Sequence, residues 1–256
     1  MKRDALLSKL LGLACLAAWE ATVRLGHTSP LVLPAPSVIA QSLWQGLSSG
    51  YLWPHIMHTL TEVVLGLLLG ASMGFVGGVL LGESARLRAV LMPYVVISQV
   101  VPKLALAPLF IVWFGFGSLP TVVMTALICF FPLLENTITC MQQVDANKLE
   151  LFRMLRASQW QTLCQLKLPA GLPNLMAGFR VAVVLAWVGA VVGEFIGASR
   201  GLGALIIAAQ GSMDTPLMFA VLTVITALGL TFYKMCEWLE RRLLGISSEL
   251  STRTSS

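Results

Sequence analysis

Apolar runs long enough to cross a lipid bilayer recur along this chain of 256 residues, and they restrict its fold more than any other feature. A membrane-spanning helix needs about 20 mainly apolar residues. Six segments meet that need, at residues 5–22, 58–82, 89–114, 119–140, 175–198 and 216–236. Backbone polar groups must be paired internally in lipid, and a helix pairs its own. We therefore predict an all-α, polytopic membrane protein with about six transmembrane helices and a single domain, residues 1–256.

The positions of the basic residues predict the orientation of the chain. Thirteen of the 17 Lys and Arg lie at one set of span ends, whereas only Arg24 and Arg200 lie at the opposite set. Cytoplasmic loops carry the excess of Lys and Arg. We therefore expect both termini, residues 83–88 and residues 141–174 to face the cytoplasm. This clustering in alternate loops explains the net charge of +5 without any nucleic-acid partner.

The second span carries glycines at four-residue spacing, which place them on one face of a helix. A glycine inside a helix costs about 1 kcal/mol relative to alanine, so the repetition requires a compensating interaction. Small residues on a membrane helix let a neighbouring backbone approach closely. We predict a tightly packed helix interface along Gly66, Gly70, Gly74, Gly78 and Gly82.

Residues 141–174 are polar and patterned as a helical hairpin rather than a linker. Asp145 can cap a first helix, in which Leu149, Phe152 and Leu155 would share one face. Ser158, with Gln161 three residues later, forms a capping-box pattern for a second helix. We expect that second helix to end before Pro169, because proline interrupts helical hydrogen bonding.

Within this hairpin, Glu150 is followed by Leu166, Leu168 and Pro169 at a spacing that resembles the EAA loop of binding-protein-dependent permeases. The resemblance implies that the hairpin couples the membrane helices to an ATPase. The implied coupling residues are Asp145, Glu150, Phe152, Arg153, Arg156, Ala157, Ser158 and Pro169.

Two positions of the hairpin depart from the family motif. Leu151 and Phe152 replace its paired alanines, and Arg156 replaces the glycine that eases the turn. We expect Arg156 to adopt an ordinary right-handed turn, or neighbouring residues to take over the role of the glycine.

Further segments resemble the sulfonate, nitrate, taurine and thiamine-pyrimidine permeases: residues 101–109, 113–117, 130–132, 201–203 and 239–244. The resemblance implies a type I ABC importer permease fold in a bacterial inner membrane. It also implies a homodimer, two cytoplasmic ATP-binding subunits and an external substrate-binding protein. The implied substrate is a small polar solute such as an alkanesulfonate, nitrate, or a pyrimidine or vitamin precursor.

No segment of the chain has the glycine-rich pattern of a phosphate-binding loop, because no glycine is followed by lysine. We therefore expect this chain to catalyse nothing and to carry no cofactor. ATP and Mg would be bound by the partner ATPase.

Charged side chains inside a membrane span cost at least about 2.5–3.5 kcal/mol and usually serve a function. We predict that polar residues of the third to fifth spans line a translocation path. Alternatively, Lys103 pairs with Glu135 or Glu194 to fix helix packing. Glu62, near an outer helix end, is expected to be solvated. The predicted path residues are Gln99, Lys103, Glu135, Asn136 and Glu194.

Two other functions compete with an importer subunit. His55, His58 and Glu62 have a spacing that could place them on one helix face as metal ligands, as in a membrane metalloenzyme. A secondary carrier for a small anion would share the apolar helices. The hairpin favours the importer, because neither alternative needs an ATPase-docking element.

Overall fold

The computed structural model describes residues 2–26, 29 and 31–253, and every regular element in these ranges is a helix. The all-α prediction is confirmed for this part of the chain. In chain order the elements are α1 (Lys2–Leu25), α2 (Pro36–Ser48), α3 (Leu52–Glu83), α4 (Ala85–Val100), η1 (Lys103–Leu106), α5 (Ala107–Phe114), α6 (Ser118–Gln142), α7 (Ala146–Met154), α8 (Gln159–Thr162), η2 (Leu163–Lys167), α9 (Leu168–Gly197), α10 (Leu202–Gly211) and α11 (Thr215–Arg253).

Four of the described helical segments are long and apolar enough to cross a membrane: Leu52–Glu83, Ser118–Gln142, Gln159–Gly197 and Thr215–Gly245. The pair α4 and α5 would make a fifth span if the two helices cross together. α1 covers the first of the six predicted spans, but it is not among these helices that are long and apolar enough to cross a membrane.

The third predicted span, residues 89–114, is not one straight helix. α4 and the η1–α5 segment meet at an angle of 77°. Pro102 lies at the break, and Val101 before it is extended, with φ −63° and ψ 123°. A residue that precedes proline is pushed out of the helical region by the proline ring, so the chain bends here. The expectation of a single continuous span was wrong at this point.

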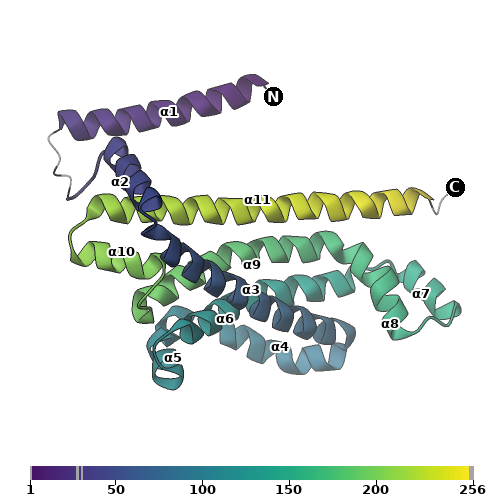
Figure 1. Ribbon diagram of the computed structural model, residues 1–256. Helices are drawn as coiled ribbons and strands as arrows, with labels where there is room; N and C mark the ends of the chain where they lie inside the picture. The colour runs from purple at the N-terminus through teal and green to yellow at the C-terminus, as the bar shows by residue number, and fades with distance from the viewer. Residues whose placement is uncertain (1, 27–28, 30, 254–256) are drawn as a thin grey trace.

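α6 lies between α3 and α9 and packs extensively against both, which makes these three helices the centre of the bundle (Figure 1). The predicted glycine interface on α3 is confirmed, and it faces α6. A Cβ atom added at Gly82 would lie 2.6 Å from the Cβ of Met141, and one at Gly74 would lie 2.9 Å from the Cβ of Leu133. Real Cβ atoms do not approach other atoms this closely, so α3 and α6 can touch only because glycine has no side chain.

α9 also packs closely against α6 through glycines, on the face of α6 opposite α3. This second glycine interface was not predicted from the sequence. A Cβ atom at Gly178 would lie 2.5 Å from the Cβ of Asn136, and one at Gly193 would lie 2.8 Å from a methyl group of Thr121. The signal was present in the sequence, because Gly189, Gly193 and Gly197 repeat at four-residue spacing, although Gly171 and Gly178 lie outside that repeat.

The two ends of the bundle differ in character (Figure 1). The α7–α8 hairpin lies at one end, where the described N-terminal end of α1 and the C-terminal end of α11 also point. α5 and α10 lie at the other end. We call these the hairpin end and the α10 end.

We expect Gly74→Leu to destabilise the fold, because the new side chain would overlap the α6 backbone. Overpacking a tight interface costs about 1–3 kcal/mol. Val76→Leu is the matched control, since Val76 is 56% exposed. Thermal unfolding of the purified protein in detergent measures the difference. An equal unfolding midpoint for both variants would show that the α3–α6 contact tolerates a side chain.

Candidate functional site

The α7–α8 hairpin is held in shape by its own helix caps. The side chain of Asp145 accepts a hydrogen bond of 2.9 Å from the backbone N–H of Asn147. Ser158 Oγ accepts from the Gln161 N–H at 3.1 Å, and Gln161 Oε1 accepts from the Ser158 N–H at 2.8 Å. Both predicted caps are therefore confirmed, and they fix where each short helix begins.

The turn between the two helices is made by Arg156 itself. Its φ is 53°, in the left-handed region that favours glycine. The N–H of Ala157 donates to the carbonyl of Phe152 at 3.0 Å and closes the turn. The expectation of an ordinary right-handed turn, or of a neighbour taking over, was wrong. A left-handed residue with a side chain costs about 1–2 kcal/mol, and the two flanking caps hold it there.

The second helix of the hairpin does not end before Pro169, contrary to prediction. α8 passes through the π-helical segment η2 into α9, so that Gln159–Gly197 is one helical path. Pro169 lies in the first turn of α9, where its missing N–H is tolerated. The wider π turn before it changes the hydrogen-bond register. The hairpin is consequently joined to a central helix without a flexible break.

An ion pair ties this junction to α3. Lys167 Nζ lies 2.7 Å from each carboxylate oxygen of Glu83, at the C-terminal end of the glycine helix. A second contact joins the amide groups of Asn174 and Gln143. A polar pocket of about 210 Å³ opens beside the ion pair and is lined by Glu83, Leu149, Arg153, Ala157, Gln159, Thr162 and Lys167.

The outward surface of the hairpin combines charge with exposed apolar side chains. Glu150 and Arg153 are exposed. Leu155, predicted to share a face with Leu149 and Phe152, is 69% exposed because α7 ends one residue before it. Met154 and Trp160 are 78% and 71% exposed. Large apolar groups beside charges are typical of a surface that binds another protein.

Lys103 lies at the start of η1, immediately after the bend. It helps to line a pocket of about 240 Å³ with Ser98, Val101, Leu106, Leu127, Phe130 and Phe131. Among the ion pairs of the described residues, none joins Lys103 to Glu135 or Glu194, so the alternative of a packing salt bridge is not seen here.

The other four predicted path residues do not line this pocket. Gln99 is half-buried, Glu135 is exposed on α6, and Asn136 donates to the carbonyl of Pro132 at 2.8 Å. Glu194 is only 1% exposed and is bonded inside the α10 end of the bundle. Its assignment to an open path is therefore wrong for this structure, because no solvent reaches it.

Glu62 was expected to be solvated, and this prediction was wrong. The side chain of Glu62, on α3, is fully buried, at 0% exposure. His58 Nε2 lies 3.3 Å from Glu62 Oε1 and 3.3 Å from the hydroxyl of Ser118. Sequence reasoning treated the outer end of α3 as a free helix end, whereas α10 and the start of α6 cover it.

His55 faces backbone instead of a metal. Its Nδ1 lies 2.9 Å from the carbonyl oxygen and 3.2 Å from the N–H of Gly201. Thr59 Oγ1 accepts from the N–H of Leu202 at 2.8 Å, and Glu194 accepts from the N–H of Gly203 at 2.5 Å. Three side chains from α3 and α9 thus hold three successive residues at the start of α10. A side chain at Gly203 would overlap Glu194, which explains the glycine.

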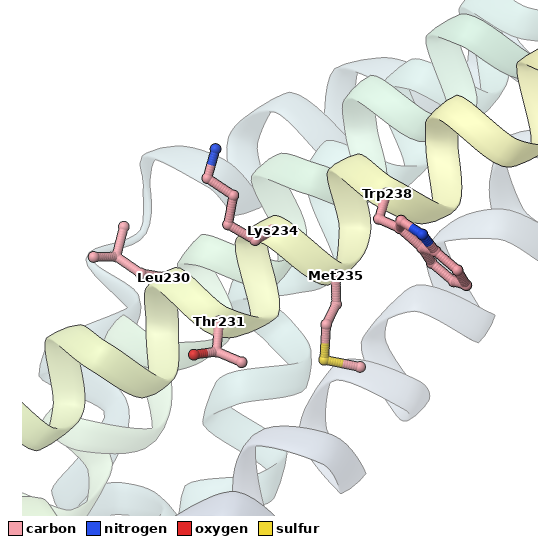
Figure 2. A pocket seen from close by; sticks show the side chains of 5 residues that line it. All are labelled: Leu230, Thr231, Lys234, Met235 and Trp238. Atoms are coloured by element: carbon pink, nitrogen blue, oxygen red, sulfur yellow. The ribbon is translucent and has the colours of Figure 1, made fainter. Parts of the chain in front are cut away.

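α11 presents an open apolar pocket of about 500 Å³ on its outer face (Figure 2). Leu230, Met235 and Trp238 contribute apolar surface, and Lys234 extends away from the helix and pairs with Glu237 at 3.0 Å. The pocket offers few polar groups to a polar solute. Its surface suits contact with lipid.

Residues 55–245 match the protein family described as binding-protein-dependent transport system inner membrane component. The chain is 39% identical to the riboflavin transport system permease protein of Chloroflexus aurantiacus, over 90% of this chain and 85% of that one. It is 33% identical to the formylaminopyrimidine transport permease protein of Halalkalibacterium halodurans, over 95% and 98%. It is 30% identical to the taurine transport system permease protein of Escherichia coli, over 89% and 85%.

Among solved structures, the chain is similar to one from an inward-facing conformation of the MetNI methionine ABC transporter. The TM-score is 0.63 at 19% identity, and the match covers 82% of this chain and 98% of that chain. At this level of identity the similarity shows a shared fold. Its extent means that nearly the whole of that chain has a counterpart here.

Proposed function

This chain belongs to the family of binding-protein-dependent transport system inner membrane components, and from that premise we propose how its residues serve transport. It is a multi-pass permease subunit of an ABC importer and not an enzyme, since ATP hydrolysis belongs to a separate chain. The family fits the importer and fits neither alternative, the secondary carrier or the membrane metalloenzyme.

The α7–α8 hairpin is our proposed contact with the ATP-binding subunit. The observation that carries this proposal is its construction: a capped, rigid hairpin with exposed Glu150, Arg153 and Met154, continuous with α9 and ion-paired to α3. A displacement of such a hairpin must be passed to the central helices, because no flexible segment separates them. The hairpin would thus convert closure of the ATPases into movement of the bundle.

The bent α4–α5 segment is our proposed wall of the translocation path, at the interface with a second copy of this chain. Its outer surface is strongly apolar: Val100, Val112 and Trp113 are 81%, 79% and 63% exposed. Lys103 lies within this segment, Gln99 is half-buried near the end of α4, and Glu135 is exposed on α6. Symmetric pairing of the apolar surfaces would bring two such lysines to a central path and leave surfaces such as the α11 pocket to lipid.

The substrate we propose is a small polar solute delivered by an external binding protein. The substrates in the names of the relatives, riboflavin, formylaminopyrimidine and taurine, range from heterocycles to a sulfonate. Lys103 favours a substrate with an anionic group, such as a sulfonate or nitrate, because an ammonium group binds anions through charge-assisted hydrogen bonds. A pyrimidine or vitamin precursor would have to bind through the aromatic Phe130 and Phe131.

The orientation we propose places the hairpin end in the cytoplasm, with both termini. Its support is the excess of basic residues at that end and the direction of α1 and α11 in Figure 1. The α10 end would then face the external binding protein.

Charge reversal at Glu150 should uncouple ATP hydrolysis from transport, because a docking surface depends on charge complementarity. In the complex reconstituted with its ATPase, Glu150→Arg should lose stimulation of ATPase by substrate while remaining inserted. Arg86→Glu reverses an exposed charge outside the hairpin and is the control. Normal stimulation in Glu150→Arg would contradict the docking role.

Neutralising Lys103 should weaken transport of an anion. A hydrogen bond to a charged group contributes about 1.5–3 kcal/mol, so we expect uptake of an alkanesulfonate by Lys103→Gln to fall at least about tenfold. Lys103→Arg retains the charge and should transport. Vesicle uptake measures both variants, and equal uptake by Lys103→Gln would remove Lys103 from the path.

Single cysteines should report the orientation. With the five native cysteines replaced, Ser212→Cys at the α10 end should react with an impermeant thiol reagent in intact cells. Met154→Cys on the hairpin should react only after the membrane is opened. Both positions are exposed. Labelling of Met154→Cys in intact cells would reverse the orientation.

A further inference from the structure

The α10 end of the bundle encloses two carboxyl groups with opposite surroundings. Glu62 from α3 and Glu194 from α9 are 0% and 1% exposed, and they lie within hydrogen-bonding reach of one another. We call these two residues, with His58, Thr59 and Ser118, the outer cluster. None of these side chains belongs to the proposed docking hairpin or translocation path.

Glu194 has the surroundings of an ionised carboxylate. Its Oε1 accepts a 2.6 Å hydrogen bond from the hydroxyl of Thr59, and its Oε2 accepts from the N–H of Gly203 at 2.5 Å. Gly203 lies in the first turn of α10, a helix of 10 residues. Free N–H groups and the helix dipole favour a negative charge at this end of a helix. Short hydrogen bonds to an ionised acceptor are the strong kind.

Glu62 has no such support. Among the described residues, no N–H or O–H group donates a hydrogen bond to either of its carboxylate oxygens. His58 approaches Oε1 at 3.3 Å without a hydrogen bond between them. A second negative charge, fully buried and beside an ionised Glu194, would be costly. A protonated Glu62 removes this cost and gains a donor, which can bond to a remaining lone pair of Glu194.

We propose that the outer cluster is a proton-binding site, in which one proton is shared between the carboxyl groups of Glu62 and Glu194 and exchanges with the outer surface through His58. The imidazole suits this exchange because it lies 3.3 Å from both Glu62 and Ser118 and is 28% exposed. The other ionisable groups that face it are His55 and Arg200.

The site has a structural consequence for α10. Its first residues are held by Glu194 and Thr59 through backbone N–H groups. Removal of the shared proton leaves two carboxylates side by side, and their repulsion would push Glu194 off the α10 end. Since the proton is bound in the folded protein and absent from an exposed glutamate at neutral pH, its contribution to stability is present at low pH and is lost as the pH rises.

Infrared spectroscopy tests the proposal on the purified permease complex. At neutral pH the wild-type protein should show the carbonyl band of a protonated carboxylic acid. Glu62→Gln should lack this band, because the amide holds no titratable proton. Glu237→Gln is the matched control and should retain it, since Glu237 pairs with Lys234 and Arg241. A wild-type spectrum without the band would overturn the proposal, and so would a band that persists in Glu62→Gln.

Thermal unfolding supplies a second readout. The unfolding midpoint of the wild type should fall as the pH is raised above neutral, and the midpoint of Glu62→Gln should fall less. The same series in sodium and in a large organic cation separates a proton from a metal ion. A rise of the wild-type midpoint that requires sodium, without the acid band, would assign the site to a cation and refute proton binding.

Discussion

Backbone-to-backbone contact of α3 and α9 with α6 is the constraint on which the rest of the structure depends. It exists because glycines occupy the contact positions on both flanking helices, such as Gly74 against Leu133 and Gly178 against Asn136. Each glycine costs about 1 kcal/mol of helix propensity, and close packing across two interfaces compensates for it. The three helices therefore form one body, to which both ends of the bundle are attached.

The body formed by α3, α6 and α9 connects the hairpin end of the bundle to the α10 end. At one end the chain leaves α6, forms a capped hairpin and returns as α9 with no flexible break. The pair Glu83–Lys167 closes the same loop onto α3. At the other end, α3 and α9 hold the start of α10 with buried polar groups. A force on the hairpin therefore reaches α10 through helices that cannot easily slide, because packed interfaces resist gradual deformation.

Much of the fold could be predicted from patterns of residues that are close together in the sequence. The glycine repeat from Gly66 to Gly82 indicated a close interface, and the spacing of Ser158 and Gln161 indicated a capping box; both are present. These features succeed because they depend on residues within one or two helical turns. The failure at Glu62 has the opposite character. The burial of Glu62 depends on α10, which is about 140 residues away in sequence, and no local pattern reports such a contact.

The sequence by itself determined that the protein lies in a membrane, that it is helical, and to which family it belongs. The length of the apolar runs, the positions of the basic residues and the spacing of the helix caps are all properties of contiguous segments, so they can be read without the tertiary structure. The sequence also contains Pro102, whose ring disfavours a helical backbone at Val101. Only the tertiary structure decided what the interruptions become: a 77° bend at Val101–Pro102, a left-handed Arg156 and a π turn before Pro169. It also decided that Glu62 and Glu194 meet. The reason is that each outcome balances a local cost against contacts made by distant parts of the chain, and those contacts exist only once the helices have packed.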